Sequence, residues 1–137
     1  MGIMQVNYYA VLVCGILMFM LGGLWYSPAL FAKRWMQLIG KTEEELKKAS
    51  NATIYVRGFI LGLMSCYVLG NIVNFAGATT VETGAMVGFI CWAGFHGAPT
   101  YNGEVNFMQR PAVLWAINSG YVLVSYLISG AILALWR

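Results

Sequence analysis

The chain has 137 residues, of which 60% are hydrophobic and only 9% are charged, whereas soluble domains carry about 25% charged residues. This composition excludes an ordinary soluble domain. The formal charge of +3 is also too small and too dispersed for a nucleic-acid-binding surface. We therefore expect one all-α membrane domain over residues 1–137, with the lipid bilayer as its surroundings and no nucleic acid as partner.

The charged residues leave four long stretches free of Asp, Glu, Lys and Arg. These stretches are residues 1–32, 58–81, 83–103 and 111–136. A helix needs about 20 mostly apolar residues to cross a hydrocarbon core roughly 30 Å thick. The sequence thus predicts a polytopic protein with four transmembrane helices.

The positive charges predict the orientation of these helices. If four helices alternate in direction, all but one of the basic residues fall on one side, namely Lys33, Arg34, Lys41, Lys47, Lys48, Arg57 and Arg110, and only Arg137 falls on the other. Cytoplasmic loops carry an excess of Lys and Arg. We expect a protein of the cell (inner or plasma) membrane with loops 1–2 and 3–4 in the cytoplasm and both termini outside.

The first crossing is predicted at residues 7–25 and is followed by a short helix at 29–39. Ser27 is a good N-cap, Pro28 suits a first helical turn, and Gly40 suits a helix end. The apolar face of the short helix holds Phe31, Trp35, Leu38 and Ile39, opposite Lys33, Arg34 and Gln37. This pattern is typical of an amphipathic helix that lies along the inner membrane surface.

The second crossing, residues 54–76, carries small or polar residues at strict four-residue intervals, namely Gly58, Gly62, Cys66, Gly70 and Asn74. Gly84 and Gly88 repeat this spacing on the third crossing. Small residues at such spacing let helix backbones approach closely, so we expect the second and third crossings to pair. The two crossings could pair within one chain or between two chains. The alternative to packing is that the glycines line a conduit.

The third crossing allows two registers. Either it ends near Ala98, or it continues to Phe107 with a kink at Pro99. The longer register places His96, Thr100 and Glu104 on one face at i, i+4 and i+8. In this register His96 lies near mid-bilayer, where polar groups turn toward protein or a water-filled cavity. His96 is therefore a candidate proton acceptor inside a cavity open to the cytoplasm, with Glu104 at the mouth of that cavity. A hydrogen-bonded packing role for His96 is the alternative.

The fourth crossing, residues 112–136, has a polar face that holds Asn118, Tyr121, Ser125 and Ser129. We expect Asn118, Tyr121 and Arg57 to lie within reach of His96 and to complete an inward-facing ligand or proton pathway. Arg57 is equally explained as an anchor whose charged head reaches the membrane surface.

Enzymatic and metal-binding templates are missing from the sequence. It contains no Asp, no G-x-S-x-G and no H-E-x-x-H motif. Cys14, Cys66 and Cys91 lie in apolar stretches without a C-x-x-C pair, so we expect them to be buried small hydrophobes. The prediction is a protein that is not an enzyme, with no catalytic residue, metal or cofactor.

Several short motifs together resemble a known family. They are Asn7-Tyr8, Leu24-Trp25-Tyr26-Ser27-Pro28, Trp35-Met36, Thr42-Glu43-Glu44, Trp92-Ala93-Gly94-Phe95, Asn118-Ser119-Gly120-Tyr121 and the run from Gly130 to Trp136. In order and spacing the sequence resembles the domain-of-unknown-function 1761 (DUF1761) family of small four-helix membrane proteins. The resemblance implies an integral membrane protein and no established activity.

Two functions compete on this evidence. The first is a small membrane protein, working as a homo-oligomer, that binds or passes a small solute or proton through an inward-facing pocket. The second is a non-catalytic membrane scaffold or homo-oligomeric assembly protein in which the glycine faces serve only for packing.

Overall fold

The structure is a computed structural model that describes residues 5–137. The described residues form helices and no strand, which confirms the all-α class. In chain order the elements are α1 (Tyr8–Trp25), α2 (Ala32–Ile39), α3 (Glu43–Ala49), α4 (Ala52–Phe75), α5 (Val81–Cys91), the π-helical η1 (Trp92–Gly97), α6 (Ala98–Thr100), the π-helical η2 (Tyr101–Phe107) and α7 (Ala112–Leu135).

Three helices, α1, α4 and α7, are long and apolar enough to cross a membrane. Asparagine side chains fix two of their starts. Asn7 Oδ1 accepts from the Tyr9 N–H at 3.0 Å and Asn51 Oδ1 accepts from the Ile54 N–H at 3.1 Å, as N-caps do. Length and apolar composition therefore support three of the four predicted crossings. The remaining predicted stretch, residues 83–103, is divided among α5, η1, α6 and η2.

Residues 81–107 nevertheless follow one continuous helical path, which we call helix 81–107, because every internal junction has right-handed helical dihedral angles. In η1 the Ala98 N–H bonds to the carbonyl of Ala93, five residues earlier. Pro99 has no N–H and its ring crowds the carbonyl four residues before it, so wider π turns on both sides let the helix pass the proline. The structure therefore has the longer predicted register, which ends at Phe107.

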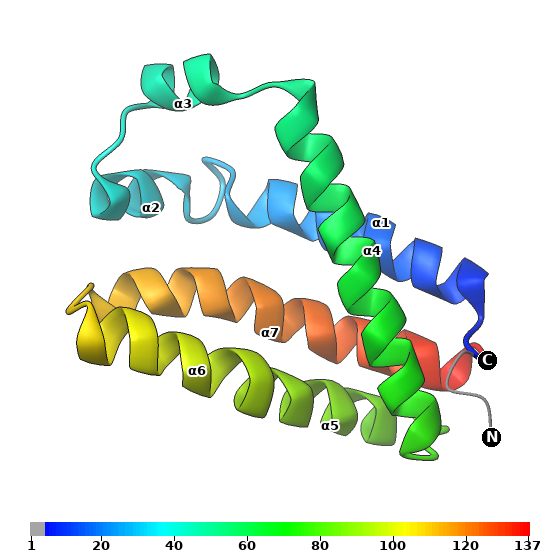
Figure 1. Ribbon diagram of the computed structural model, residues 1–137. Coiled ribbons are helices and arrows are strands. Elements are labelled where there is room, and N and C mark those ends of the chain that lie inside the picture. Colours follow the sequence, from blue (N-terminus) through cyan, green and yellow to red (C-terminus); the bar gives the residue numbers. More distant parts are fainter. Residues whose placement is uncertain (1–4) are drawn as a thin grey trace.

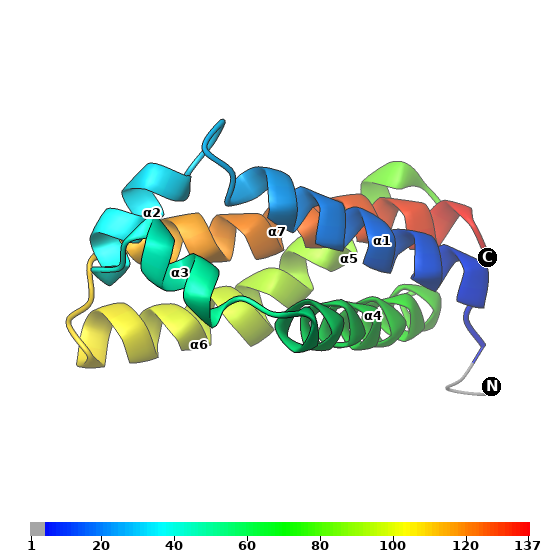
Figure 2. The ribbon, with the colours of Figure 1, turned by 90° about the horizontal axis from the view of Figure 1, so that it is seen from above.

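The long helices differ in direction. Helix 81–107 and α7 form an antiparallel hairpin, and α1 lies along α7 (Figure 1). In contrast, α4 is steeply inclined to the others and is seen nearly end-on from above (Figure 2). The turn before α7 and the helix α2 lie at one end of the bundle, whereas the C-terminus and the start of α1 lie at the other.

The tightest helix contact joins α5 and α7. A Cβ atom added at Gly84 would lie 2.2 Å from the carbonyl oxygen of Gly130, and one added at Gly88 would lie 2.2 Å from that of Tyr126. Only glycine allows backbones to approach this closely. The glycines of the predicted third crossing thus face α7 rather than the second crossing. Their spacing indicated a surface open to close approach, but it did not indicate which helix would approach.

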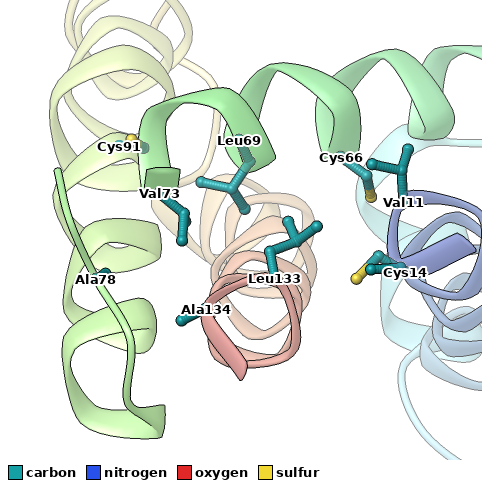
Figure 3. Close-up of a cluster of buried hydrophobic side chains, with 10 residues drawn as sticks. Val11, Cys14, Cys66, Leu69, Val73, Ala78, Cys91, Leu133 and Ala134 are labelled. Atoms are coloured by element: carbon teal, nitrogen blue, oxygen red, sulfur yellow. The ribbon is translucent and has the colours of Figure 1, made fainter. Parts of the chain in front are cut away.

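The core lies where α1, α4, α5 and α7 meet and is filled by small side chains (Figure 3). Cys14, Cys66 and Cys91 are all buried, as predicted. The Cys14 thiol donates to the carbonyl oxygen of Ser129 at 3.9 Å, and the Cys66 thiol lies 4.0 Å from the hydroxyl of the same serine. One serine of α7 therefore connects α1 with α4.

The short helix α2 begins at Ala32, later than predicted. Ser27 does not cap it, because its Oγ donates to the Leu24 carbonyl at 2.7 Å, at the end of α1. Trp25 packs on Phe31 with ring centroids 4.9 Å apart, and its Nε1–H donates to the Ile117 carbonyl of α7 at 2.8 Å. These contacts hold residues 26–31 in turns, which prevents an earlier helix start.

The amphipathic character of α2 agrees with the prediction. Trp35 is half-buried, whereas Lys33 and Arg34 are exposed. The helix ends at Gly40, whose φ of 70° is left-handed and suits glycine. The following α3 begins at the Thr42 cap, whose hydroxyl oxygen accepts from the Glu45 N–H at 3.2 Å.

We predict that Gly88→Ala lowers the stability of the bundle by about 2 kcal/mol, because its Cβ atom would overlap the backbone of Tyr126. The control is Gly94→Ala, since an added Cβ there meets nothing within 4 Å. Thermal unfolding in detergent measures both. Equal melting temperatures for the two variants would show that the α5–α7 contact is looser than described.

Candidate functional site

A groove of about 720 Å³ lies between α1 and α4. It extends from Gly15 and Ser65 at mid-helix to Trp35 of α2. Its remaining lining comes from α1, α4 and α7, namely Met18, Phe19, Gly22, Gly23, Tyr26, Ile54, Tyr55, Gly58, Leu61, Gly62 and Tyr121. We call this hollow the α1–α4 groove.

The groove exists because α1 and α4 contact each other only along part of their lengths. Near its start, α4 inclines away from α1, and α2 and α3 connect the separated ends (Figure 1). Five glycines line the space, and two of them were predicted to pack helices. A Cβ added at Gly58 would meet nothing within 4 Å, and one at Gly62 would reach only the Met18 sulfur at 3.7 Å. These two glycines leave space in the groove.

The other predicted packing glycines lie elsewhere. Gly84 and Gly88 form the α5–α7 contact described above. An added Cβ at Gly70 would lie 3.2 Å from Val6 and 3.3 Å from Leu133, so this glycine is enclosed at the opposite end of α4. The glycines at regular four-residue spacing along α4 therefore have different roles. Gly70 allows a close contact, whereas Gly58 borders open space.

A polar cluster forms one wall of the groove. The Tyr26 hydroxyl donates to Asn118 Oδ1 at 2.8 Å, and the Tyr121 hydroxyl donates to the Met18 carbonyl at 2.7 Å. The two phenol rings are 5.8 Å apart, edge to face. Gly22 makes room for this arrangement, because a Cβ there would lie 3.1 Å from the Tyr121 hydroxyl. The structure thus brings together two predicted site residues, Asn118 and Tyr121.

Burial, with the neighbouring Tyr121 phenol as the second cause, raises the pKa of Tyr26 to about 12 from its ordinary value of 10.0. The folded state therefore holds this proton more tightly than the unfolded state. Its stabilising contribution is fully present below pH 10 and is lost as the pH rises from there toward 12. At physiological pH, Tyr26 is a permanent hydrogen-bond donor to Asn118.

Three hydroxyl groups of the groove already use their protons inside the protein. Besides Tyr26 and Tyr121, Ser65 Oγ donates to the Leu61 carbonyl at 3.1 Å. Their oxygens thus offer acceptor lone pairs to a bound molecule. The Tyr55 hydroxyl differs, because it accepts from Ser50 Oγ at 2.9 Å and keeps its own proton. The Trp35 indole N–H donates no hydrogen bond within residues 5–137, so it is available as a donor. No lining residue is charged.

The predicted face of helix 81–107 lies outside the α1–α4 groove. Thr100 Oγ1 donates to the His96 carbonyl at 2.7 Å and accepts from Trp115 Nε1–H at 2.8 Å. His96 and Glu104 are half-buried, and their side chains make no hydrogen bond or ion pair within the described residues. Their role in a proton pathway stays a prediction.

Arg57 is exposed near the start of α4. It does not line the groove, although its neighbour Gly58 does. Within residues 5–137 its guanidinium forms no hydrogen bond or ion pair. The position agrees with the alternative interpretation of this residue as an anchor at the membrane surface.

Comparison with known protein families shows to which family the chain belongs. Residues 9–134 match the family described as protein of unknown function (DUF1761). The chain belongs to this family. No curated protein and no solved structure gives a significant match. Membership in DUF1761 confirms the resemblance noted in the sequence and brings no activity with it.

Sequence reasoning missed part of the groove in this DUF1761 protein. Gly15, Gly22 and Gly23 of α1 were not singled out, although the Gly22-Gly23 pair directly before Trp25 was a signal. Tyr26 and Trp35 were not predicted as site residues either. Their ring centroids are 5.3 Å apart, edge to face, and the two side chains close the end of the groove.

We predict that Tyr26 and Asn118 are energetically coupled by about 0.6–1.7 kcal/mol, the range measured for hydrogen bonds between membrane helices. Tyr26→Phe, Asn118→Ala and the double variant form the cycle, measured by unfolding in mixed detergent. The coupling should be constant up to about pH 10 and decline above it, because the Tyr26 proton is then lost from the unfolded chain first.

The control for this cycle is Tyr9→Phe. Tyr9 is 75% exposed, and its hydroxyl makes no hydrogen bond within residues 5–137. Additive effects of the Tyr26 and Asn118 substitutions would mean that the hydrogen bond does not contribute to the folded state.

Proposed function

We propose that this protein is a non-catalytic membrane protein that binds a single-chain amphiphile with a neutral, hydroxyl-bearing polar end in the α1–α4 groove. The observation that carries the proposal is the groove itself. It is a space of about 720 Å³ between two helices that are long and apolar enough to span a membrane, with glycines along its length and phenol and indole groups at one end.

The location favours a ligand that arrives from the membrane. Because α1 and α4 are both suited to span the bilayer, a molecule dissolved in the lipid reaches the groove directly. Moving an acyl chain from lipid into an apolar groove gains little free energy, since lipid tails are as apolar as the side chains. Selectivity therefore depends on the shape left by the glycines and on the polar groups at the α2 end.

The polar groups favour a neutral hydroxyl over an ion. The lining has no Lys or Arg to pair with a phosphate or carboxylate, and no acid to pair with an amine. The oxygens of Tyr26 and Tyr121 accept hydrogen bonds, whereas the indole N–H of Trp35 donates one. An alcohol both donates and accepts, so a long-chain alcohol or a monoacylglycerol matches this set.

A second candidate rests on the same face of α4. If a second copy of the chain packed against Gly58 and Gly62, the groove would be a homo-oligomer interface of the small-residue type. This reading supports the scaffold function. The two candidates differ in what fills the groove, a lipid-like molecule or a helix.

We predict that a long-chain alcohol bearing a photoreactive diazirine labels α1 and α4 at the groove in lipid vesicles. Gly58→Leu should abolish this labelling, because its side chain fills open space, and it should leave the melting temperature unchanged. Gly94→Leu is the matched control, since it also adds an exposed side chain with nothing within 4 Å of its Cβ. Unlabelled alcohol should compete, and a fatty acid of equal length should not.

Labelling of the wild-type protein spread evenly over all lipid-facing helices would overturn the amphiphile proposal. Particle mass in nanodiscs tests the second candidate. A Gly58→Leu variant that loses subunits while the wild-type groove takes no label would establish the assembly function instead.

The proposal includes a topology in which helix 81–107 also crosses the membrane, as the third of four crossings, and both ends of the chain lie outside. Its continuous helical path and its pairing along α7 support this placement (Figure 1). All basic residues except Arg137 then gather on the cytoplasmic side, in agreement with the excess of Lys and Arg in cytoplasmic loops of membrane proteins.

We predict that cysteines introduced at Thr79 and Met108 lie on opposite sides of the membrane. Thr79 and Met108 are both exposed, so substitution is tolerated, and the three native cysteines are buried. An impermeant maleimide added to intact cells should label Thr79→Cys, and it should label Met108→Cys only after permeabilisation. Labelling of both from the same side would show that helix 81–107 does not cross.

A further inference from the structure

A second hollow of about 480 Å³ lies along helix 81–107 and the start of α7, and it shares no lining residue with the α1–α4 groove. Its walls include the rings of Trp92, Tyr101 and Trp115 and the side chains of Asn102 and Asn106. We call it the aromatic pocket. Most of its lining residues belong to the part of helix 81–107 that precedes the turn into α7. That turn lies at one end of the bundle (Figure 1).

The indole N–H groups of the aromatic pocket are bonded within the protein. Trp92 Nε1–H donates to the Ser119 carbonyl at 2.9 Å, and Trp115 Nε1–H donates to Thr100 Oγ1 at 2.8 Å. These bonds fix both rings. They also remove the indole donors from the pocket, so what the rings present to a ligand is mainly their π electrons.

The three rings form one connected surface. Tyr101 stands at 89° to Trp115 with centroids 5.0 Å apart, and Trp92 lies 6.3 Å from Trp115. Gly97 keeps space beside Trp92, because a Cβ atom there would lie 3.2 Å from the indole. A larger residue at this position would fill the pocket and displace the ring.

The amide groups of the pocket include a free acceptor oxygen. Asn106 Nδ2 donates to Asn102 Oδ1 at 2.9 Å, which leaves the Asn106 Oδ1 acceptor without a partner among residues 5–137. No Lys or Arg lines the pocket. Aromatic faces and amide oxygens together attract a cation, whereas no charged side chain lines the pocket to hold an anion.

We infer that the aromatic pocket binds an alkylammonium group. Aromatic surfaces recognise such groups through the attraction between a cation and the ring quadrupole, which is strongest for tryptophan. The pocket lies near the bundle end that carries Arg110, where the surface of the membrane is expected. The same chemistry occurs in the headgroup of a zwitterionic phospholipid and in a free alkylammonium ion.

The test compares the wild-type protein with Tyr101→Leu and Tyr101→Phe. Tyr101 is 42% exposed, so its replacement leaves the core intact, and Tyr101→Phe keeps the ring while removing the hydroxyl. Titration with tetramethylammonium chloride, with sodium chloride as the ionic-strength control, is followed by tryptophan fluorescence. We expect Tyr101→Leu to weaken binding about fivefold and Tyr101→Phe to bind as the wild type does.

A second measurement identifies the source of the cation. The protein is placed in nanodiscs of mixed phosphatidylcholine and phosphatidylglycerol and is then released from them. Native mass spectrometry identifies the lipid that stays bound to the released protein. Preferential retention of phosphatidylcholine, reduced by Tyr101→Leu, establishes a lipid headgroup as the ligand. Tetramethylammonium binding without any lipid preference establishes a free ion. If the wild type shows neither, or if Tyr101→Leu equals the wild type in both, the inference is overturned.

Discussion

The close approach of α5 to α7 is the contact on which the rest of the arrangement depends. At Gly84, Gly88 and Gly130 the two backbones lie so near each other that no side chain fits between them. In lipid, where apolar burial gives little driving force between helices, such packing is a main source of association. Once α5 is fixed on one side of α7, the other side is free for α1, and α4 can only cross over the pair.

Hydrogen bonds from large aromatic side chains then set the positions of the helices along their axes. Trp25, Trp92 and Trp115 each donate an indole N–H across a helix contact, and the tyrosines Tyr26 and Tyr121 do the same with their hydroxyls. A buried polar donor without a partner is costly in a membrane, so each of these bonds specifies one register. This explains how a chain with so few charges reaches a defined structure.

The two hollows follow from the same geometry. The steep inclination of α4 separates it from α1 at the α2 end, and the glycines there do not fill the gap. The π-helical turns that carry helix 81–107 past Pro99 bring Tyr101 next to Trp115. One hollow offers hydroxyl oxygens and a free indole N–H, whereas the other offers ring faces and amide oxygens. Their chemical difference is the reason for assigning them different ligands.

The sequence by itself determined the class of the fold and most helix ends. Charge-free stretches predict helices in a membrane because a charge is costly in hydrocarbon, and Gly40 marks a helix end through purely local chemistry. The family assignment was likewise readable from motifs. The start of α2 was misplaced because Ser27 and Trp25 form their bonds with α1 and α7, and a local pattern does not contain such contacts.

Only the tertiary structure decided which polar residues share a site. Asn118 and Tyr121 join Tyr26 rather than His96, because helical spacing gives the face of a residue and leaves the partner of that face unknown. The same limit applies to the glycines. Gly58 and Gly88 have identical local signals, yet one borders open space and the other touches a backbone, since the inclination of α4 is set by contacts between residues far apart in the chain.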